Sequence, residues 1–392
     1  MVHNEYGALS GEEVIVARMV QLLRDHGHQV AMLTRCSADI HGLTGKTRAL
    51  FSGIYSFRSR GEMKRLLAGA ERPDIVHVHN LYPQLSPSIL LECRSSQVPV
   101  VMTVHNSRLM CPNGLLFRAG HICQECRGGR EYRCLLRNCM GSVTKSFGYS
   151  LRGMVARTWR MYRDNVWMYL ALTDFQRRLM VAEGYCGERI AVLPHFGPDS
   201  PVISRPSPGG SIAFVGRISP EKGFGHFLEL AKRHPDIPFV AAGAYDHAPQ
   251  LARQVPSNLQ LLGHVAGPRL AEVYANARML VVASVWYEAF GLVILEAMKQ
   301  GVPVVCSRIG GLAEIVENGQ TGLLFEPGNA QDLDEKAMQL WSNPTLCAQL
   351  GEAARVKAAT EYSAQRYYDR LMALYERTIS LGAPSKDMEA AI

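Results

Sequence analysis

Short apolar runs alternate with amphipathic stretches along the first half of the chain. Five runs rich in β-branched residues are typical of buried parallel strands, and they lie at residues 28–34, 74–80, 98–106, 167–173 and 189–195. The segment 12–27 predicts a helix that ends at Gly27, with an apolar stripe formed by Val16, Met19, Val20 and Leu23. Strands that alternate with helices predict a doubly wound parallel sheet.

The second half repeats this pattern after a segment that interrupts it. Residues 197–210 contain four Pro, three Gly and three Ser, which favour neither strand nor helix, and we interpret them as an interdomain linker. Further strands are predicted at residues 211–217, 237–243, 259–265, 278–284 and 302–308. The fold class predicted is α/β, with two doubly wound, Rossmann-like domains that face each other across a cleft.

These patterns set the predicted domain limits. The N-terminal domain is expected at 1–196, the linker at 197–210, the second domain at 211–362, and a C-terminal helix and tail at 363–392. The amphipathic stretch 364–379 has no strand after it, so its apolar face is expected to pack back on the first domain.

The start of the chain is short for such a fold. A first strand of about five or six residues is expected, but only residues 1–4 precede the loop at 5–11. We therefore expect that the sequence begins at an internal Met and lacks part of its first strand.

The composition is that of an ordinary globular protein. The chain has 392 residues, of which 47% are hydrophobic and 20% charged, and this excludes a small peptide and a largely disordered protein. No run approaches the roughly 18 apolar residues of a spanning helix, and the N-terminus lacks the layout of a signal peptide. We therefore expect a cytoplasmic protein.

The net charge of +7 is unevenly distributed. Residues 1–195 contain 25 Lys and Arg against 15 Asp and Glu, whereas residues 196–392 contain 17 against 20. An excess of positive charge in one domain points to an anionic partner, either phosphates or an anionic lipid surface. Nucleic acid is not expected, because no nucleic-acid-binding motif accompanies the charge.

One basic stretch, residues 145–169, has two interpretations. It is expected to form an amphipathic helix in which apolar residues alternate with Lys145, Arg152, Arg157, Arg160 and Arg163. Such a helix can lie on an anionic membrane. It is equally consistent with a domain helix whose apolar face is in the core and whose arginines are in water.

Candidate chemistry in the second half begins after its first strand. In the segment 216–223, Arg217 and Lys222 leave the carboxyl edge of the sheet beside the start of a helix. Two cations and a helix N-terminus make an anion site suited to a diphosphate. The alternative is a solvated basic turn.

The segment 287–296 combines backbone amides with two carboxylates. Glu288 lies in a loop and Glu296 in the first turns of the predicted helix. Between them, the helix start offers the backbone amides of Phe290, Gly291, Leu292 and Val293. Amides suit phosphate oxygens and carboxylates accept from hydroxyls, so the segment suits a nucleoside diphosphate sugar. For Glu296 the alternative is a favourable charge near a helix N-terminus.

Several motifs together resemble the retaining glycosyltransferases of family 4, which have the GT-B fold. They are GRISPEKG at 216–223, Glu288 and Glu296 with seven residues between them, 311–328, HVHN at 77–80 and TVHN at 103–106. The resemblance covers nearly the whole chain. It implies that Arg217 and Lys222 bind the donor diphosphate, that Glu288 contacts hydroxyls of the transferred sugar, and that Glu296 binds the ribose. It also implies donor contacts at Gly216, His264 and Val265, the last two beside the nucleobase.

The resemblance extends to the first half with two departures. His105 matches the family histidine that faces the transferred sugar, and Gly11 matches a glycine near the donor phosphate. Glu12 stands where a second glycine is usual. His195 lies where family members commonly carry Asn-Gly, so no function is assigned to it.

The activity implied is transfer of a hexose from a UDP- or GDP-sugar to a polysaccharide or lipid-linked glycan. We expect the acceptor to attack the face that the diphosphate leaves, without a divalent metal, with His105, Arg217, Lys222 and Glu288 as the catalytic set. One alternative is a noncatalytic scaffold that binds nucleotide sugars. Another is an enzyme of this fold that acts on phosphate acceptors.

Half of the ten cysteines fall in the loop at 109–140, which contains Cys111, Cys123, Cys126, Cys134 and Cys139. Disulfides are not expected in cytosol. The Cys123-x-x-Cys126 pair with further thiols predicts a structural zinc site that takes no part in the chemistry. Free thiols in an ordered loop are the alternative.

Overall fold

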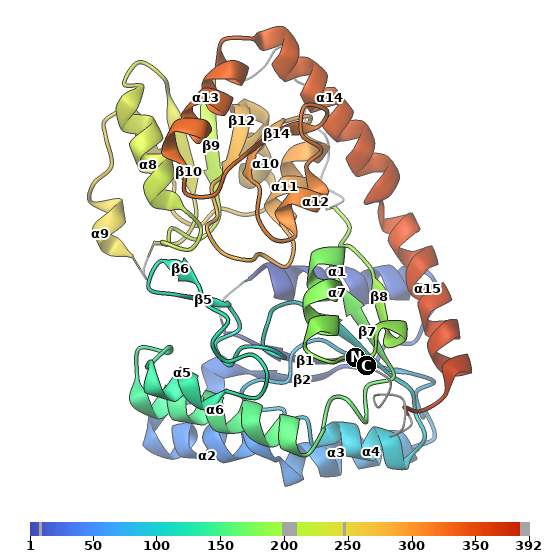
Figure 1. Cartoon of the computed structure of the whole chain (residues 1–392). Coiled ribbons are helices and arrows are strands. Elements are labelled where there is room, and N and C mark those ends of the chain that lie inside the picture. The colour runs from blue at the N-terminus through green and yellow to red at the C-terminus, as the bar shows by residue number, and fades with distance from the viewer. Residues whose placement is uncertain (8–9, 198–209, 246–247, 385–392) are drawn as a thin grey trace. The chain divides into compact units, whose positions relative to one another are not determined.

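The computed structural model describes residues 1–7, 10–197, 210–245 and 248–384. The chain divides into two compact units (Figure 1). The first unit comprises residues 1–116, 124–194 and 368–392, and the second comprises 117–123 and 195–367. Of the proposed linker at 197–210, all but the two end residues lie outside the described residues.

The first unit is built on a parallel six-stranded sheet with the strand order β2-β1-β3-β4-β7-β8. Four residues at the start of the chain form β1, which pairs with β2 and β3. The predicted strand at 28–34 is displaced toward the C-terminus, because His28 and Gln29 are solvent-accessible and pairing begins at Leu33. The strands are β1 (Val2–Glu5), β2 (Leu33–Cys36), β3 (Val76–Val78), β4 (Val100–Val104), β7 (Met168–Ala171) and β8 (Ile190–Val192).

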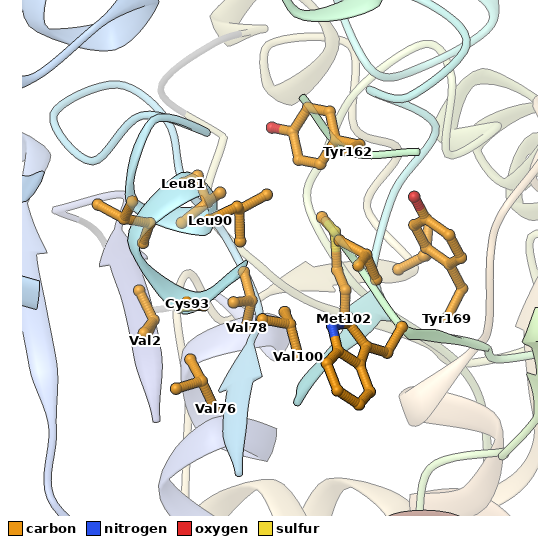
Figure 2. Packing of buried hydrophobic residues seen from close by; sticks show 14 of the residues in the cluster. Val2, Val76, Val78, Leu81, Leu90, Cys93, Val100, Met102, Tyr162 and Tyr169 are labelled. Atoms are coloured by element: carbon orange, nitrogen blue, oxygen red, sulfur yellow. The ribbon is translucent and has the colours of Figure 1, made fainter. Parts of the chain in front are cut away.

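One core cluster of this unit consists of side chains from one face of β3 and β4 and from the helices that cover it, and residues of the opposite face, such as His77 and Val101, are buried as well. Val78, Val100 and Leu90 are fully buried in it, and Figure 2 shows them together with Met102, Tyr162 and Tyr169 of the same cluster. Parallel strands buried on both faces read as continuous apolar runs, which is why the sequence pattern located them.

The helices of the first unit connect these strands. In α1 the predicted stripe of Val16, Met19, Val20 and Leu23 is buried, and the helix ends two residues before Gly27. The helices are α1 (Gly11–Asp25), α2 (Gly42–Ile54), α3 (Phe57–Ala68), α4 (Ile89–Ser95), α5 (Tyr132–Leu136), α6 (Val143–Thr158) and α7 (Asp174–Ala182), with short 3-10 turns at Ser37–Asp39 and Gly187–Arg189.

The helix expected at 145–169 is shorter than predicted. α6 ends at Thr158, and Arg160 has a positive φ of 48°, which no continuing helix allows. Arg152, which the amphipathic interpretation placed in water or on a membrane, is buried with its guanidinium over the Tyr82 and Tyr149 rings. Stacking on aromatic rings compensates part of the cost of burying this charge.

The second unit is a second parallel six-stranded sheet with the order β11-β10-β9-β12-β13-β14. Its core is rich in phenylalanine from β9, α8 and β10. The sixth strand, β14, was not among the strands predicted from the apolar runs. The strands are β9 (Ser211–Val215), β10 (Phe239–Ala242), β11 (Leu259–Leu261), β12 (Ala277–Val282), β13 (Val304–Ser307) and β14 (Gly322–Phe325).

Helices separate these strands, and a small hairpin is grouped with the same unit. The helices are α8 (Phe224–Arg233), α9 (Pro249–Ala252), α10 (Pro268–Asn276), α11 (Leu292–Lys299), α12 (Leu312–Ile315), α13 (Ala330–Trp341) and α14 (Pro344–Glu361), and the hairpin strands are β5 (Phe117–Arg118) and β6 (His121–Ile122).

The final helix, α15 (Ala364–Leu381), confirms the expectation that the tail packs on the first unit. Tyr368 stacks on the His26 ring with centroids 3.7 Å apart. Further along the helix, Arg370 donates to the Val192 carbonyl at 2.7 Å, and the Tyr375 hydroxyl bonds His77 Nδ1 at 2.6 Å. The α/β class with two doubly wound sheets and a C-terminal helix is therefore confirmed.

Candidate donor site and first-unit histidine cluster

Lys222 and Glu288 meet at the carboxyl edge of the second sheet. Lys222 Nζ lies 2.8 Å from Glu288 Oε1, and the same oxygen accepts a hydrogen bond from Ser284 Oγ. The Glu288 side chain is 7% exposed and the Lys222 side chain 22%. Lys222 also lies 5.6 Å from the centroid of the Trp286 ring. The structure therefore places a partly buried cation and carboxylate in direct contact.

Gly223 explains why the two loops come so close. It has a φ of +71°, and a Cβ atom added there would lie 1.7 Å from the Ala283 carbonyl oxygen. Only glycine allows both the backbone angle and the contact. The backbone bond from Val285 N to Glu221 O, at 3.0 Å, holds the loops together. Lys222 is thereby placed against the exit of β12.

A second glycine supports Glu288 from the other side. Gly310 has a φ of +56°, and a Cβ atom added there would lie 3.0 Å from the backbone carbonyl oxygen of Glu288. The next residue, Gly311, donates its N–H to the Glu288 carbonyl at 3.0 Å. The loop after β13 thus fixes the backbone of Glu288.

The helix start predicted after Glu288 is present. α11 begins at Leu292 with Gly291 as its N-cap residue, so the amides of Leu292 and Val293 have no carbonyl one turn earlier to bond. The Phe290 ring is buried and meets the His195 ring edge-on at 5.3 Å. Only the backbone of Phe290 is therefore a candidate for ligand binding, and its ring belongs to the core.

Glu296 lies one turn into α11. The hydroxyl of buried Tyr274 donates to Glu296 Oε2 at 2.9 Å. Burial and the adjacent carboxylate raise the pKa of Tyr274 well above its usual value, so the phenol stays a donor. Tyr274, which sequence patterns did not single out, orients the carboxylate expected to bind ribose.

The remaining predicted donor residues lie at the ends of β9 and β11. Gly216 donates to the Ala242 carbonyl at 2.9 Å. Arg217 is exposed and pairs with Glu221 at 3.1 Å, so it does not join the Lys222 and Glu288 pair in this structure. His264 is exposed and Val265 is half-buried. They directly follow Gly263, whose carbonyl oxygen accepts a hydrogen bond from Gly243 N at 2.8 Å.

In the first unit, His105 is part of a cluster of imidazoles. It follows β4, and its Nε2 lies 2.8 Å from Nδ1 of His79, which follows β3. His79 stacks on His77, with centroids 4.5 Å apart and an interplanar angle of 17°. Burial lowers the pKa of His77 to about 3 and that of His79 well below its usual value, so these two rings are neutral at pH 7. The HVHN motif signals this cluster, but its spacing alone does not reveal the contact with His105.

Glu12, the residue that departs from the family pattern, is also buried there. Its side chain is 9% exposed, Oε2 accepts from the Tyr6 hydroxyl at 3.0 Å, and Oε1 lies 3.8 Å from His3 Nδ1. Burial raises the pKa of Glu12 to about 7. Arg108 stacks on the Tyr6 ring at 5.3 Å. Gly11 is the exposed first residue of α1. Sequence reasoning assigned no role to Tyr6 or Arg108.

The cysteine-rich loop contains thiols in contact but no grouped ligand set among the described residues. Cys111 and Cys126 are in thiol contact, and the hydrogen bond from Cys126 lowers the pKa of Cys111. Burial raises the pKa of Cys134 to about 12. In the part of the chain that the structure describes, no three His, Cys, Asp or Glu side chains are grouped to hold a metal ion. Zinc binding by Cys111, Cys123, Cys126, Cys134 and Cys139 therefore stays a prediction without a ligand set.

Sequence comparison decides the family. The model described as "Glycosyl transferases group 1" matches residues 200–357, and the model described as "Glycosyltransferase Family 4" matches residues 9–196. The chain belongs to the group 1 glycosyltransferases. The resemblance inferred from the motifs is thereby confirmed.

The glycosyltransferase has relatives of several kinds. It is 28% identical over 380 residues to α-D-kanosaminyltransferase of Streptomyces kanamyceticus, across 91% of this chain and 90% of that protein. It is 30% identical over 205 residues to α-maltose-1-phosphate synthase of Mycolicibacterium smegmatis. That match covers 48% of this chain and about half of that relative, 51% of its length.

Solved structures confirm the GT-B fold of this glycosyltransferase. HepE of Anabaena, solved in complex with UDP and glucose, superimposes with a TM-score of 0.68 at 16% identity, over 96% of this chain and 99% of that one. Sucrose-phosphate synthase of Thermosynechococcus elongatus gives a TM-score of 0.70 at 18% identity, over 97% and 96%.

Proposed function

We propose that this group 1 glycosyltransferase transfers a hexose from a nucleoside diphosphate sugar, with retention at the anomeric carbon, to a polysaccharide or lipid-linked glycan. The observation that carries the proposal is the contact between Lys222 and Glu288 beside the N-terminus of α11. A cation, a carboxylate and helix amides in one place match the phosphates and hydroxyls of such a donor. UDP is the first nucleotide to test, because HepE was solved with UDP.

Each donor-site residue has a proposed role. Lys222 and Arg217 bind the diphosphate, with the α11 amides as further donors. Lys222 and Ser284 both bond Oε1 of Glu288, so we assign Oε2 to a sugar hydroxyl. Glu296, oriented by Tyr274, accepts from the ribose hydroxyls. Gly216, His264 and Val265 contribute to nucleotide binding, as the family resemblance implies.

The proposed reaction is a substitution on one face of the sugar. The bond from the anomeric carbon to the diphosphate oxygen breaks, and its electron pair leaves with the diphosphate. The acceptor oxygen bonds the same carbon, and its proton passes to the departing diphosphate. Lys222, Arg217 and the amides stabilise the charge that develops there, which is the role a divalent metal has in other transferases. We propose that His105 and Gly11 act on the sugar and phosphate side, respectively.

A thermal-shift panel with UDP, GDP and ADP, each with and without a chelator, tests this function. A ligand at about 100 times its dissociation constant stabilises the folded state by roughly 2.7 kcal/mol. We expect one nucleotide to raise the melting temperature equally with and without chelator. Loss of the shift on chelation would overturn metal independence, and no shift with any nucleotide would favour the noncatalytic scaffold.

Product stereochemistry tests retention. With the nucleotide identified, the corresponding α-linked donor sugar is incubated with candidate glycan acceptors, and the new linkage is read from the anomeric proton coupling by NMR. Retention predicts an α-linkage. A β-linkage would overturn the single-face mechanism while leaving the transferase function intact.

We also propose that the first unit contacts an anionic membrane through α6. Val143, Phe147 and Met154 form an exposed apolar stripe at helical spacing, and Lys145 is exposed beside it. No helix among the described residues is long and apolar enough to span a bilayer. We expect the protein to sediment with phosphatidylglycerol vesicles. The double variant Phe147→Ser, Met154→Ser is expected to stay in the supernatant. If the wild type and the double variant sedimented equally, α6 would not be the membrane-contacting surface.

A further inference from the structure

We propose that His79 is a positioning residue that fixes the tautomer and the ring orientation of His105. The inference rests on the proposed role of His105 toward the transferred sugar, and it adds the group that prepares His105 for it. His79 itself is buried, with 3% of its surface exposed, so it acts through His105 and not on a substrate.

Strand order brings the two histidines together. β3 and β4 are parallel neighbours, paired from Val76 with Val100 to Val78 with Met102. His79 is the first residue after β3 and His105 the first after β4. Their rings lie 5.1 Å apart at 35°, and the His79 Nδ1 to His105 Nε2 distance of 2.8 Å is that of a good hydrogen bond.

The surroundings of His79 decide which nitrogen carries the proton. His79 Nε2 is buried and has no hydrogen-bond partner among the described residues. A buried N–H without an acceptor is rarer in proteins than an unused acceptor. We therefore place the proton on His79 Nδ1, which donates to His105 Nε2. In its neutral form, His105 then carries its own proton on Nδ1, because each neutral imidazole has one N–H.

A second layer keeps the His79 ring in place. The nearly parallel His77 ring covers one of its faces. His77 is held at both nitrogens, by Thr103 Oγ1 at 2.7 Å and by the Tyr375 hydroxyl of α15 at 2.6 Å. With its support held at both ends, the His79 ring has little freedom to turn away from His105.

The charge environment of the cluster also favours the neutral form of His79. The titratable groups that face His79 are His77, His105 and His3, with the N-terminal amine further off. Burial and these potential cations lower the pKa of His79 well below its usual value. His79 is therefore neutral at pH 7, and it gives His105 one constant partner there.

This arrangement supplies a defined donor. With Nε2 engaged by His79, the proton of His105 is on Nδ1, where a sugar hydroxyl or a phosphate oxygen would accept it. A histidine that exchanged between tautomers would offer a donor for only part of the time. Positioning thus removes a conformational cost from substrate binding and turnover.

Nitrogen NMR on ¹⁵N-histidine-labelled full-length protein tests the proposal without any substrate. The His105 signals are identified by their loss in His105→Ala. We expect the Nδ1–H tautomer in the wild type, and a shift toward Nε2–H in His79→Phe, which keeps the ring size but loses the donor. His79→Asn, whose side-chain amide nitrogen takes the place of Nδ1, should restore the wild-type tautomer. An unchanged His105 tautomer in His79→Phe would overturn the proposal.

Turnover of UDP-glucose, followed as UDP release, provides the functional arm. His79→Phe should lower kcat at least tenfold with little change in KM, and His79→Asn should recover part of it. His79→Phe combined with His105→Ala should be no slower than His105→Ala alone, because both remove one function. Additive losses would mean a purely structural role. Exposed His121→Gln is the control. Failure of the wild type to bind UDP would overturn the proposed donor but leave the NMR result intact.

Discussion

Lys222 and Glu288 are a charge pair that the enclosing loops leave only partly solvated. Breaking a buried pair leaves one charge without compensation, and this costs more than the loss of a surface pair. Its contact with Glu288, which lies four residues before α11, supports the proposal that Lys222 stabilises a leaving diphosphate. The pair therefore has consequences for both folding and turnover, which can be measured separately.

Replacing Lys222 with Ala tests the catalytic part. Removing one preorganised group that stabilises developing charge costs about 3 kcal/mol, or roughly 10²-fold in kcat. We expect that loss in kcat measured with UDP-glucose. Lys232→Ala is the matched control, because Lys232 is an exposed lysine that pairs with Glu229 on α8. Wild-type kcat in Lys222→Ala would remove Lys222 from the diphosphate site.

The buried Glu12 carboxyl is expected to make the free energy of unfolding depend on pH. Burial raises its pKa from 4.5 to about 7, so the folded state holds this proton more tightly than the unfolded state does. Stability from this group is present below pH 4.5 and is lost as the pH rises through 7. Above pH 7 the cost is on the order of 3 kcal/mol, taking about 1.4 kcal/mol per pKa unit.

Glu12→Gln removes that cost. We expect the variant to unfold at a higher urea concentration than the wild type at pH 8, and the difference to disappear at pH 4.5. Glu71→Gln, an exposed substitution, is the control and should match the wild type at both pH values. If Glu12→Gln were equally or less stable at pH 8, the carboxylate would not be the strained group that its burial indicates.

Elements are where sequence and structure agree best. Nine of the ten apolar runs became strands near their predicted positions, since continuous burial leaves a direct trace in the sequence. The strand expected at 28–34 moved toward Cys36, and β14 was missed. α6 ended early, at Thr158, and its packed face includes Arg152 and small polar residues instead of an apolar stripe. A helix that buries polar residues does not show the apolar periodicity from which helices are predicted.

The candidate site was predictable in part from its motifs. Motif positions located Lys222, Glu288 and Glu296 on the correct loops and helix. Their partners Ser284 and Tyr274, and the contact between His79 and His105, depend on how neighbouring strands are ordered. Strand order is set by packing over the whole sheet, and local sequence does not encode it.

Gly223 determines how closely α8 approaches β12. In Gly223→Ala the new Cβ would need the space of the Ala283 carbonyl oxygen, and the backbone would be strained at positive φ. We expect a loss of several kcal/mol in the free energy of unfolding, measured by urea, and weaker UDP binding because Lys222 moves from Glu288.

Gly225→Ala is the matched control, two residues further along. A Cβ there meets nothing within 4 Å, and the position is helical. Alanine should therefore stabilise α8 by up to about 1 kcal/mol. If the two substitutions behaved alike, the close approach of α8 to β12 would not be what positions Lys222.

At the scale of the whole molecule, buried neutral histidines are distributed over both units. His77 and His79 belong to the first unit and His195 to the second. Burial lowers the pKa of His77 and of His195 to about 3, from an ordinary value of 6.5. Unfolding lets each imidazole take up a proton once the pH falls below 6.5. The stability that comes from keeping these rings neutral is therefore present above pH 6.5 and is lost progressively toward pH 3.

The slope of the free energy of unfolding against pH is proportional to the number of protons that the protein takes up on unfolding. Near pH 5 His77 and His195 each add about 1.4 kcal/mol per pH unit, whereas Glu12, which titrates in the opposite sense, subtracts from the total. Urea unfolding of His195→Gln between pH 4.5 and 6 should give a slope lower by about one proton, even if the variant is less stable throughout. His121→Gln should leave the slope unchanged, because His121 is exposed. The other titrating groups contribute equally in all these proteins, so an unaltered slope in His195→Gln would mean that His195 is not held neutral by the fold.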